Sequence, residues 1–246
     1  MKNCNKWQPS KFIFKNGRLI ASRDINEFGI ESRLVGDMTA KFYHEKIKIY
    51  AKGKLLDLGC GKVPLYDVYK KYITENVCVD WENTLHKNEY LDFECDLTKK
   101  LPFKDREFDT IILSDVLEHI PNPSELWKEM ARILAVNGKI IINVPFYFWI
   151  HEKPHDYYRY TEFALRRFVE NSNLKLVELE KMGGVLEIVA ILISKHFVWK
   201  PSLGNPLAEG IQLITKIFSE TGLGKKISNK SSEACPLAYY LVAEKR

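Results

Sequence analysis

The sequence predicts an α/β fold with a mainly parallel sheet and helices on both of its faces. From Lys54 onward, short apolar runs without strict alternation are separated by segments of helical periodicity. This order is typical of a parallel sheet that is buried on both sides. The first apolar run leads directly into the turn Gly59-Cys60-Gly61. A strand, a glycine turn and a helix in succession form the basic unit of nucleotide-binding α/β folds.

Each element has a local signal. The strands are expected at residues 54–58, 77–80, 108–113, 139–144, 175–180 and 238–243, and the helices at 37–50, 65–72, 123–136 and 161–170. Pro64 suits the first turn of a helix. Asn122, Pro123 and Glu125 together are a typical helix start, with Asn122 as the N-cap. We expect the last strand to lie beside the strand at 175–180.

Four segments are predicted along the chain. They are a helical lead-in at 1–52, the core of the α/β domain at 53–182, a helical insertion at 183–234, and the final strand of the core sheet at 235–246. Residues 1–36 have no clear period. The insertion includes a helix, from Val185 to Ile193, that is nearly apolar all round. This pattern favours burial on the domain, and the alternatives are a dimer face, a lid or a shallow membrane contact.

Composition excludes several classes of protein. The hydrophobic fraction of 46% and the charged fraction of 28% exclude a mostly disordered chain. The net charge of +5 is too weak by itself to indicate a nucleic-acid partner. Five cysteines without a CxxC pair predict neither a disulfide framework nor a zinc cluster, and they favour a reducing, cytoplasmic location. We therefore expect no metal site, no signal peptide and no transmembrane segment.

The glycine turn indicates the charge of its ligand. Gly59 and Gly61 let the backbone approach a ligand closely, although a plain tight turn is the alternative. Asp57 stands just before the turn, and the third glycine of a dinucleotide fingerprint is absent. A buried carboxylate opposes a diphosphate, and therefore a nicotinamide dehydrogenase. It favours a ligand with an ammonium and a sulfonium group, such as S-adenosylmethionine.

Two further acids fit an adenosine. Asp80 ends the second strand and lies 23 residues after Asp57, a place from which a carboxylate can accept hydrogen bonds from ribose hydroxyls. Trp81 offers a flat apolar face to an adenine. Asp96 could accept the adenine amino group. The alternatives are a helix cap or turn former for Asp80 and a solvated loop acid for Asp96.

The motifs as a set resemble a known family. The segments LLDLGCG, VCVD, CDLTKKLPF, FDTIILSDVLEHI and ILAVNGKIIINVPF are similar to the ordered motifs of class I S-adenosylmethionine-dependent methyltransferases of the type-11 domain, over residues 53–182. The segment HDYYRYT is similar to an active-site loop of bacterial members. The resemblance implies a Rossmann-like, doubly wound sheet of seven strands with the last strand antiparallel. It also implies cofactor contacts from Asp57, Gly59, Cys60 and Gly61 to the methionine part, from Asp80 and Trp81 to the ribose and adenine, from Asp96 and Leu97 to the adenine, and from Ser114 and Asp115 to the methionine end.

The acceptor of the methyl group should lie beyond the ends of the fourth and fifth strands. Methyl transfer requires the nucleophile, the methyl group and the sulfur atom in line, and a hydroxyl acceptor must also lose a proton. The catalytic candidates are His119, His151 and His155, with His155 and Asp156 as an oriented pair. The alternative is that these residues only fix a long loop to the sheet.

Substrate contacts are expected from Tyr157, Tyr158 and Arg159. Arg159 could bind a carboxylate or phosphate through two hydrogen bonds, and a surface ion pair is its alternative. The expected substrate is a small molecule or a glycan unit, with O-methylation in a bacterial surface-polysaccharide pathway as one setting. The alternatives are an RNA or protein methyltransferase and a regulatory protein that binds S-adenosylmethionine without catalysis. A homodimer is also considered.

Overall fold

The computed structural model describes residues 1–82, 89–200 and 203–246. The chain forms two compact units. The core unit comprises Met1–Pro9, Glu45–Glu180 and Tyr239–Arg246, and the helical unit comprises Ser10–His44 and Lys181–Ala238. Each unit is considered on its own below.

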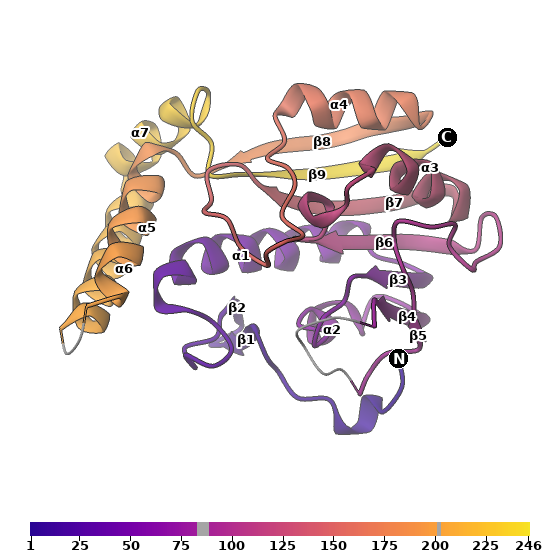
Figure 1. Cartoon of the computed structure of the whole chain (residues 1–246), viewed down its shortest axis with the longest axis horizontal. Helices are drawn as coiled ribbons and strands as arrows, with labels where there is room; N and C mark the ends of the chain where they lie inside the picture. Colours follow the sequence, from indigo (N-terminus) through magenta and orange to yellow (C-terminus); the bar gives the residue numbers. More distant parts are fainter. Residues whose placement is uncertain (83–88, 201–202) are drawn as a thin grey trace. The chain divides into compact units, whose positions relative to one another are not determined.

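A seven-stranded sheet organises the core unit and confirms the predicted fold class (Figure 1). Its strands are β3 (Lys54–Leu58), β4 (Glu75–Asp80), β5 (Phe93–Glu94), β6 (Phe108–Ser114), β7 (Leu134–Pro145), β8 (Leu174–Met182) and β9 (Ala238–Lys245). Their spatial order is β5-β4-β3-β6-β7-β9-β8, so the last strand lies beside β8 as expected. The pairs β3–β4, β3–β6 and β6–β7 are parallel, and one strand of the sheet is antiparallel. The strand order reverses at β3, where ligands bind in sheets of this kind.

The helices follow the predicted order with some changes in length. They are α1 (Arg33–Tyr50), α2 (Tyr66–Tyr69), α3 (Pro123–Ile133), α4 (Glu162–Asn171), α5 (Val185–Val198), α6 (Gly204–Glu220) and α7 (Gly222–Ser232), with short 3-10 turns η1 (Cys4–Lys6), η2 (Ile30–Ser32) and η3 (Leu117–His119). Helix α2 is shorter than the predicted 65–72, since after Tyr69 the chain closes a tighter turn in which the Tyr72 N–H donates to the Tyr69 carbonyl. Helix α3 has Pro123 in its first turn, but Asn122 makes no side-chain capping bond.

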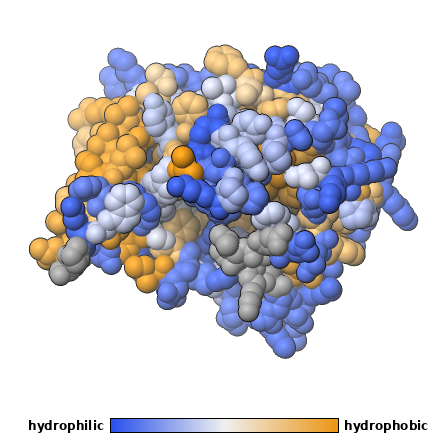
Figure 2. Space-filling view, viewed as in Figure 1, coloured by the Kyte–Doolittle hydropathy of each residue, from blue (hydrophilic) through white to orange (hydrophobic). Residues whose placement is uncertain are grey.

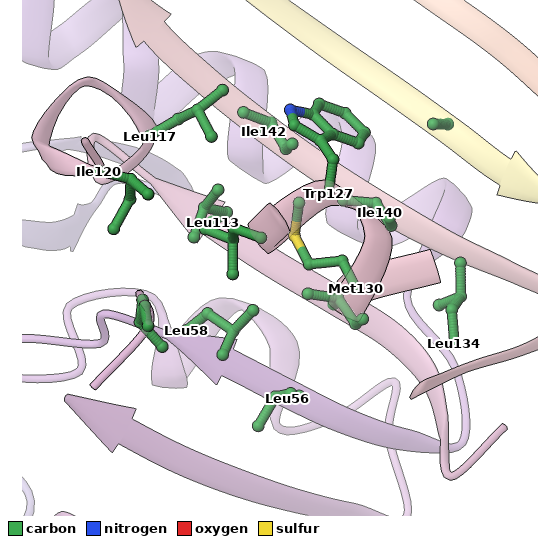
Figure 3. Packing of buried hydrophobic residues seen from close by; sticks show 14 of the residues in the cluster. Leu56, Leu58, Leu113, Leu117, Ile120, Trp127, Met130, Leu134, Ile140 and Ile142 are labelled. Carbon is green, nitrogen blue, oxygen red and sulfur yellow. The ribbon is translucent and has the colours of Figure 1, made fainter. Parts of the chain in front are cut away.

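Packing between α3 and the sheet forms the main hydrophobic core (Figure 3). Trp127 and Met130 are fully buried and face Ile140 and Ile142 of β7. Burying a side chain of this kind contributes about 1.5–3 kcal/mol. This core fixes the strands of the sheet, and so holds the ends of β3, β4 and β6 in place for the site described below.

A hairpin in the helical unit was not predicted. Strands β1 (Phe12–Lys15) and β2 (Arg18–Ala21) pair in antiparallel register. The turn residues Asn16 and Gly17 have φ of 52° and 74°. An Asn-Gly pair between two short apolar runs is a strong hairpin signal, so the information was present in a segment that we interpreted as an aperiodic lead-in.

Helix α5 of the helical unit is buried on one side only. Ile188 and Ile191 are 7% and 1% exposed, whereas Val189 and Leu192 are 46% and 54% exposed. Exposed apolar side chains also occur on α6 and α7, and apolar residues gather over these helices in Figure 2. Among the described residues, no helix is long and apolar enough to cross a membrane.

Candidate active site

The glycine turn joins the tips of β3 and β4. The N–H groups of Gly59 and Cys60 both donate to the Val79 carbonyl, at 2.9 and 3.1 Å. The Gly61 N–H donates to Asp80 Oδ2 at 2.8 Å. These bonds bring the predicted cofactor residues of both strands to one edge of the sheet.

Asp57 lies at the buried start of this turn. Asp57 is 3% exposed, and the Tyr69 hydroxyl donates a hydrogen bond to its Oδ2 at 3.2 Å. Burial raises the pKa of Asp57 to about 7, the Tyr69 hydrogen bond opposes the rise, and the charge of Asp80 adds to it. A buried carboxylate is stabilised by a positively charged ligand and repels a diphosphate. The site therefore fits a ligand with an ammonium and a sulfonium group.

The turn has a backbone conformation and a packing that favour glycine. Gly59 and Gly61 have φ of 67° and 50°, a conformation that glycine adopts without strain. A Cβ atom on Gly59 would lie 2.5 Å from Val116 Cγ2. Val63 is fully buried with φ of 52°, which is rare for a β-branched residue. The sequence thus departs from the three-glycine fingerprint by placing a strained valine in the loop.

Asp80 and Trp81 lie at the tip of β4. Asp80 is 8% exposed, and the Trp81 N–H donates to its Oδ1 at 2.9 Å. The Trp81 ring makes an edge contact with the His155 ring, with centroids 5.0 Å apart. The long segment after β7 therefore reaches the predicted adenosine end of the site.

Asp96 and Leu97 follow the short strand β5. The Thr98 N–H and hydroxyl both donate to Asp96 Oδ1, and Lys99 Nζ lies 3.1 Å from Oδ2. These hydrogen bonds lower the pKa of Asp96. Leu97 is buried. Asp96 is thus a fixed loop carboxylate, and its contact with an adenine stays a prediction.

Ser114 and Asp115 lie at the end of β6, as predicted. Ser114 is opposite Asn143 in the β6–β7 register. The Asn143 side-chain amide donates to Asp115 Oδ1, and the Asp115 N–H donates to the Asn143 carbonyl at 3.3 Å. Asp115 has φ of 52°, so the chain turns sharply here. Sequence reasoning did not assign Asn143 to the site.

Directly after this turn, an acid and two histidines meet. Glu118 and His119 lie on η3, and His151 comes from the segment after β7. Glu118 Oε1 lies 3.8 Å from His119 Nε2 and 3.9 Å from His151 Nε2. The two imidazole rings contact edge to face with centroids 4.7 Å apart. Two of the predicted catalytic histidines are therefore neighbours, although 32 residues separate them in the sequence.

Glu118, which directly precedes His119, is the residue of this cluster to which sequence reasoning assigned no role. It is fully buried. Burial, together with the charge of Asp115, raises the pKa of Glu118 well above its ordinary value. The apolar residues that flank Glu118 in the sequence form an ordinary helix-like pattern. Only its position in the folded structure shows that Glu118 belongs to the site.

The segment that carries His151 is tied firmly to η3. The N–H groups of Tyr157 and Tyr158 donate to the Glu118 carbonyl at 3.0 and 3.3 Å. The Tyr158 hydroxyl donates to the Pro121 carbonyl, and the Tyr160 hydroxyl donates to the Leu117 carbonyl. Tyr157 and Tyr158 remain 45% and 39% exposed. Their backbone is therefore structural, while their rings are available for the substrate contacts that we predicted.

Asp156 makes different contacts from those expected. It lies 3.4 Å from His151 Nδ1 and accepts the His151 N–H, rather than pairing with His155. Arg159 Nη1 and Nη2 donate to its two oxygens at 2.6 and 2.8 Å, and this pairing lowers the pKa of Asp156 to about 2. His155 Nδ1 instead lies 3.3 Å from the Tyr157 hydroxyl.

The guanidinium of Arg159 is fully used within the loop. Besides Asp156, it donates to the carbonyls of Phe148, Trp149 and Tyr158. All five of its N–H groups therefore have partners inside the segment. This arrangement agrees with the ion-pair alternative for Arg159 rather than with an anion-binding role.

The fold and the site define a class of protein. Residues 56–142 match the family model of a methyltransferase domain. A structure of an S-adenosylmethionine-dependent methyltransferase from Mesorhizobium loti aligns with 86% of this chain and 100% of its own, with a TM-score of 0.55 at 12% identity. This likeness shows the fold.

Curated relatives match this chain either at low identity over a long stretch or at higher identity over a short stretch. A ubiquinone biosynthesis O-methyltransferase of Coxiella burnetii is 24% identical over 59% of this chain and 73% of its own length. Two uncharacterized proteins of Methanocaldococcus jannaschii are 48% identical over 44 residues and 33% identical over 104 residues. The chain spans only 22% and 40% of the lengths of these two relatives.

The match at residues 56–142 identifies a methyltransferase domain within the core unit, and the chain shares the fold of the solved methyltransferase structure. The cofactor of such domains is S-adenosylmethionine, and the buried carboxyl group of Asp57 suits its positive charge.

Proposed function

We propose that this chain transfers a methyl group from S-adenosylmethionine to an oxygen atom of a small molecule or a glycan unit. The observation that carries the proposal is the cluster of buried Glu118 with the half-buried His119 and His151. Glu118 lies three residues after Asp115, the last of the predicted cofactor contacts. An oxygen acceptor must lose a proton during methylation, and this cluster supplies imidazole groups for that purpose. The relative from Coxiella burnetii is an O-methyltransferase by name, which supports an oxygen acceptor.

The cofactor supplies a methyl group on a positively charged sulfur atom. Asp57 would attract its charged end, and the turn Gly59-Cys60-Gly61 would admit it closely. Asp80 and Trp81 would hold the ribose and adenine, with Asp96 and Leu97 at the adenine edge. Ser114 and Asp115 would line the methionine end, next to the acceptor.

The histidines would accept the proton that the acceptor hydroxyl loses. His119 Nδ1 lies 2.8 Å from the His155 carbonyl, and a carbonyl accepts only, so Nδ1 carries the hydrogen and Nε2 has the lone pair. Burial and the neighbouring His119 lower the pKa of His151, which keeps its ring neutral near neutral pH. A neutral imidazole with an unprotonated ring nitrogen is suited to take up a hydroxyl proton.

The experiment is a transfer assay with methyl-labelled cofactor and the full-length chain. Candidate acceptors are phenols, catechols and sugar nucleotides, and products are detected by mass spectrometry as a gain of one CH₂. Transfer to an oxygen of one of these acceptors supports the proposal. Transfer only to RNA or protein supports the second enzyme class. Cofactor binding without any transfer, in the presence of an acceptor that occupies the site, supports a regulatory protein.

The biological setting is also part of the proposal. A bacterial surface-polysaccharide pathway in the cytoplasm agrees with a glycan acceptor and with five free cysteines. In this proposal, residues 53–182 and 235–246 carry the chemistry. Association through the apolar side chains of α5–α7, as a homodimer or as a shallow membrane contact, stays a prediction. Sedimentation velocity and vesicle flotation distinguish the two.

A further inference from the structure

The cluster at η3 has the composition of a metal site. It consists of one carboxylate and two imidazoles, from Glu118, His119 and His151, and their nearest ligand-type atoms all lie within 4.8 Å of one another. This site was not predicted, because the five cysteines without a CxxC pair indicated no metal site. The three residues come from two segments that meet only in the folded core unit.

Glu118 is the observation that points to a missing ligand. Its residue is 0% exposed, and neither carboxylate oxygen accepts a hydrogen bond from another residue in the described part of the chain. His119 Nε2 also lacks a hydrogen-bond partner there. Buried polar atoms without partners cost free energy. Here three of them are gathered around one point, which a bound cation would satisfy.

Both imidazoles are oriented as metal ligands usually are. In such sites the nitrogen that does not bind metal donates to a carbonyl or a carboxylate. His119 Nδ1 lies 2.8 Å from the His155 carbonyl. His151 Nδ1 lies 3.3 Å from the Trp149 carbonyl and 3.4 Å from Asp156 Oδ2. These contacts leave Nε2 of each ring for a metal ion, and both Nε2 atoms lie within 4 Å of Glu118 Oε1.

The distances allow one ion to be shared by Glu118 and a histidine. Zinc bonds to histidine nitrogen and to carboxylate oxygen are about 2.0–2.2 Å long, so two of them span up to roughly 4.2 Å. The two Nε2 atoms lie 3.8 and 3.9 Å from Glu118 Oε1. One ion can thus reach Glu118 and either histidine without a change in the backbone.

A second carboxylate lies at the open side of the cluster. Glu152 Oε2 is 3.8 Å from His119 Nε2, and the Glu152 side chain is 47% exposed. Its charge adds to the attraction for a cation, and its exposure allows it to be replaced by a water molecule or an acceptor oxygen. Three protein ligands with one exchangeable position are the arrangement of catalytic zinc sites.

We propose that Glu118, His119 and His151 form a binding site for one divalent transition-metal ion of the zinc type, with Glu152 or water as the fourth ligand. Imidazole ligands favour zinc and its neighbours over magnesium and calcium, which prefer oxygen ligands. If the proposed O-methylation holds, the ion would bind the acceptor hydroxyl and lower its pKa. In that case the ion takes over the role that the proposed function gives to the two histidines: they serve as ligands, and the acceptor proton is lost to water. Metal binding itself does not depend on the proposed function.

The test uses the full-length protein after treatment with a chelator and removal of that chelator. Titration with Co²⁺, followed by visible absorption, should show one equivalent bound with the bands of nitrogen and oxygen coordination. Zn²⁺ should displace the Co²⁺, and Mg²⁺ in excess should not. Bound Zn²⁺ should raise the unfolding temperature, because it binds only the folded state.

Variants locate the site. Glu118→Gln, which keeps the shape of the side chain, and His151→Ala should each weaken Co²⁺ binding at least a hundredfold. His196→Ala, which removes a histidine from α5 of the helical unit, should leave it unchanged. Circular dichroism and the unfolding temperature of the metal-free variants show whether they are folded. If Glu118→Gln does not fold, His151→Ala decides the question.

Two results would overturn the inference. One is the absence of stoichiometric Co²⁺ or Zn²⁺ binding by folded protein. The other is unchanged binding in the folded variants, or absorption bands of thiolate coordination, which would place the ion on cysteines. Calorimetry with S-adenosylmethionine on the same samples keeps the two proposals apart: lost cofactor binding with intact metal binding contradicts the proposed function and not this inference.

Discussion

Asp80 is the single residue on which the orientation of the cofactor depends most. Its carboxylate is fixed at the tip of β4 by the N–H groups of Gly61 and Trp81. Asp80→Ala should weaken S-adenosylmethionine binding at least about tenfold, or about 1.4 kcal/mol, because the ribose hydroxyls lose their acceptor. Calorimetric titration measures this affinity. An affinity equal to that of the unmodified protein would refute the assignment of Asp80.

Asp57 should make cofactor binding depend on pH. Its pKa of about 7 means that the carboxyl is largely neutral below that pH in the unliganded protein. A neutral carboxyl does not attract the positive sulfur and ammonium groups, so the affinity should fall as the pH falls through about 7. Binding in this range should also release a proton.

Asp57→Asn is the matched control for this pH dependence. The amide is neutral at every pH, so the variant should bind weakly and with a flat profile below about pH 7, where an α-amino group with a pKa of about 7.7–8.0 is already protonated. Titration in two buffers of different ionisation enthalpy detects the released proton. The same pH profile in both proteins would show that another group is responsible.

Residues in the site divide by how well sequence could anticipate them. Asp57, Asp80 and the glycines lie at strand ends, and the strand pattern alone predicts that they share one edge of the sheet. Asp156 shows the limit of this reasoning. Its pairing with Arg159 and His151 depends on how the loop folds back, and adjacency in the sequence favoured His155 instead.

The turn Gly59-Cys60-Gly61 is the element that carries the predicted contacts to the methionine part of the cofactor. In Gly59→Ala the new Cβ would approach Val116 Cγ2 to 2.5 Å, and the residue would keep a φ of 67° that disfavours a side chain. This variant should lose about 1–3 kcal/mol of folding stability, as for other strained positions, and should bind the cofactor more weakly. Denaturant unfolding and calorimetry measure the two effects.

Gly210→Ala is the control for this substitution. Gly210 lies within α6, and a Cβ there has open space. Alanine should therefore be neutral or stabilise the protein by up to about 1 kcal/mol. Equal losses in the two variants would mean that the turn at Gly59 is not specially constrained.

The segment after β7 is the element that brings His151 to the site. Arg159 holds this segment together through its hydrogen bonds. Arg159→Met removes the partner of Asp156 and the donors to three carbonyls. Amide hydrogen exchange at Tyr157 and Tyr158 should become at least several times faster, while β3 and β4 keep their protection. Unchanged exchange in the loop would show that its tyrosines hold it without the arginine.

Helices and strands in the core unit were predicted well, because hydrophobic period and turn residues specify them locally. The end of α2 differed because the chain closes a tighter local turn after Tyr69, which the hydrophobic period does not specify. The hairpin β1–β2 was missed because residues 1–36 have no clear period, although the Asn16-Gly17 pair is typical of a hairpin turn. The cluster of Glu118 and His151 needed the fold itself, since no spacing rule joins two segments so far apart.

At the scale of the whole molecule, the two units have separate internal networks. In the helical unit, buried Glu187 accepts hydrogen bonds from the Gly184 N–H and the Ser228 hydroxyl, both at about 3 Å. Glu187→Ala should leave both donors unpaired at a cost of about 1–3 kcal/mol. Hydrogen exchange in α5 and α7 should rise, while cofactor affinity stays close to that of the unmodified protein. A matching loss of cofactor binding would contradict the independence of the site from this network.

At the tips of β3 and β4, the whole protein should prefer a positively charged sulfur cofactor to a diphosphate. Calorimetric titration of the full-length protein with S-adenosylmethionine and, separately, with NAD tests this preference most directly. S-adenosylmethionine should bind with one site per chain, and NAD should give no saturable signal. Saturable binding of NAD, with no response to S-adenosylmethionine, would contradict it.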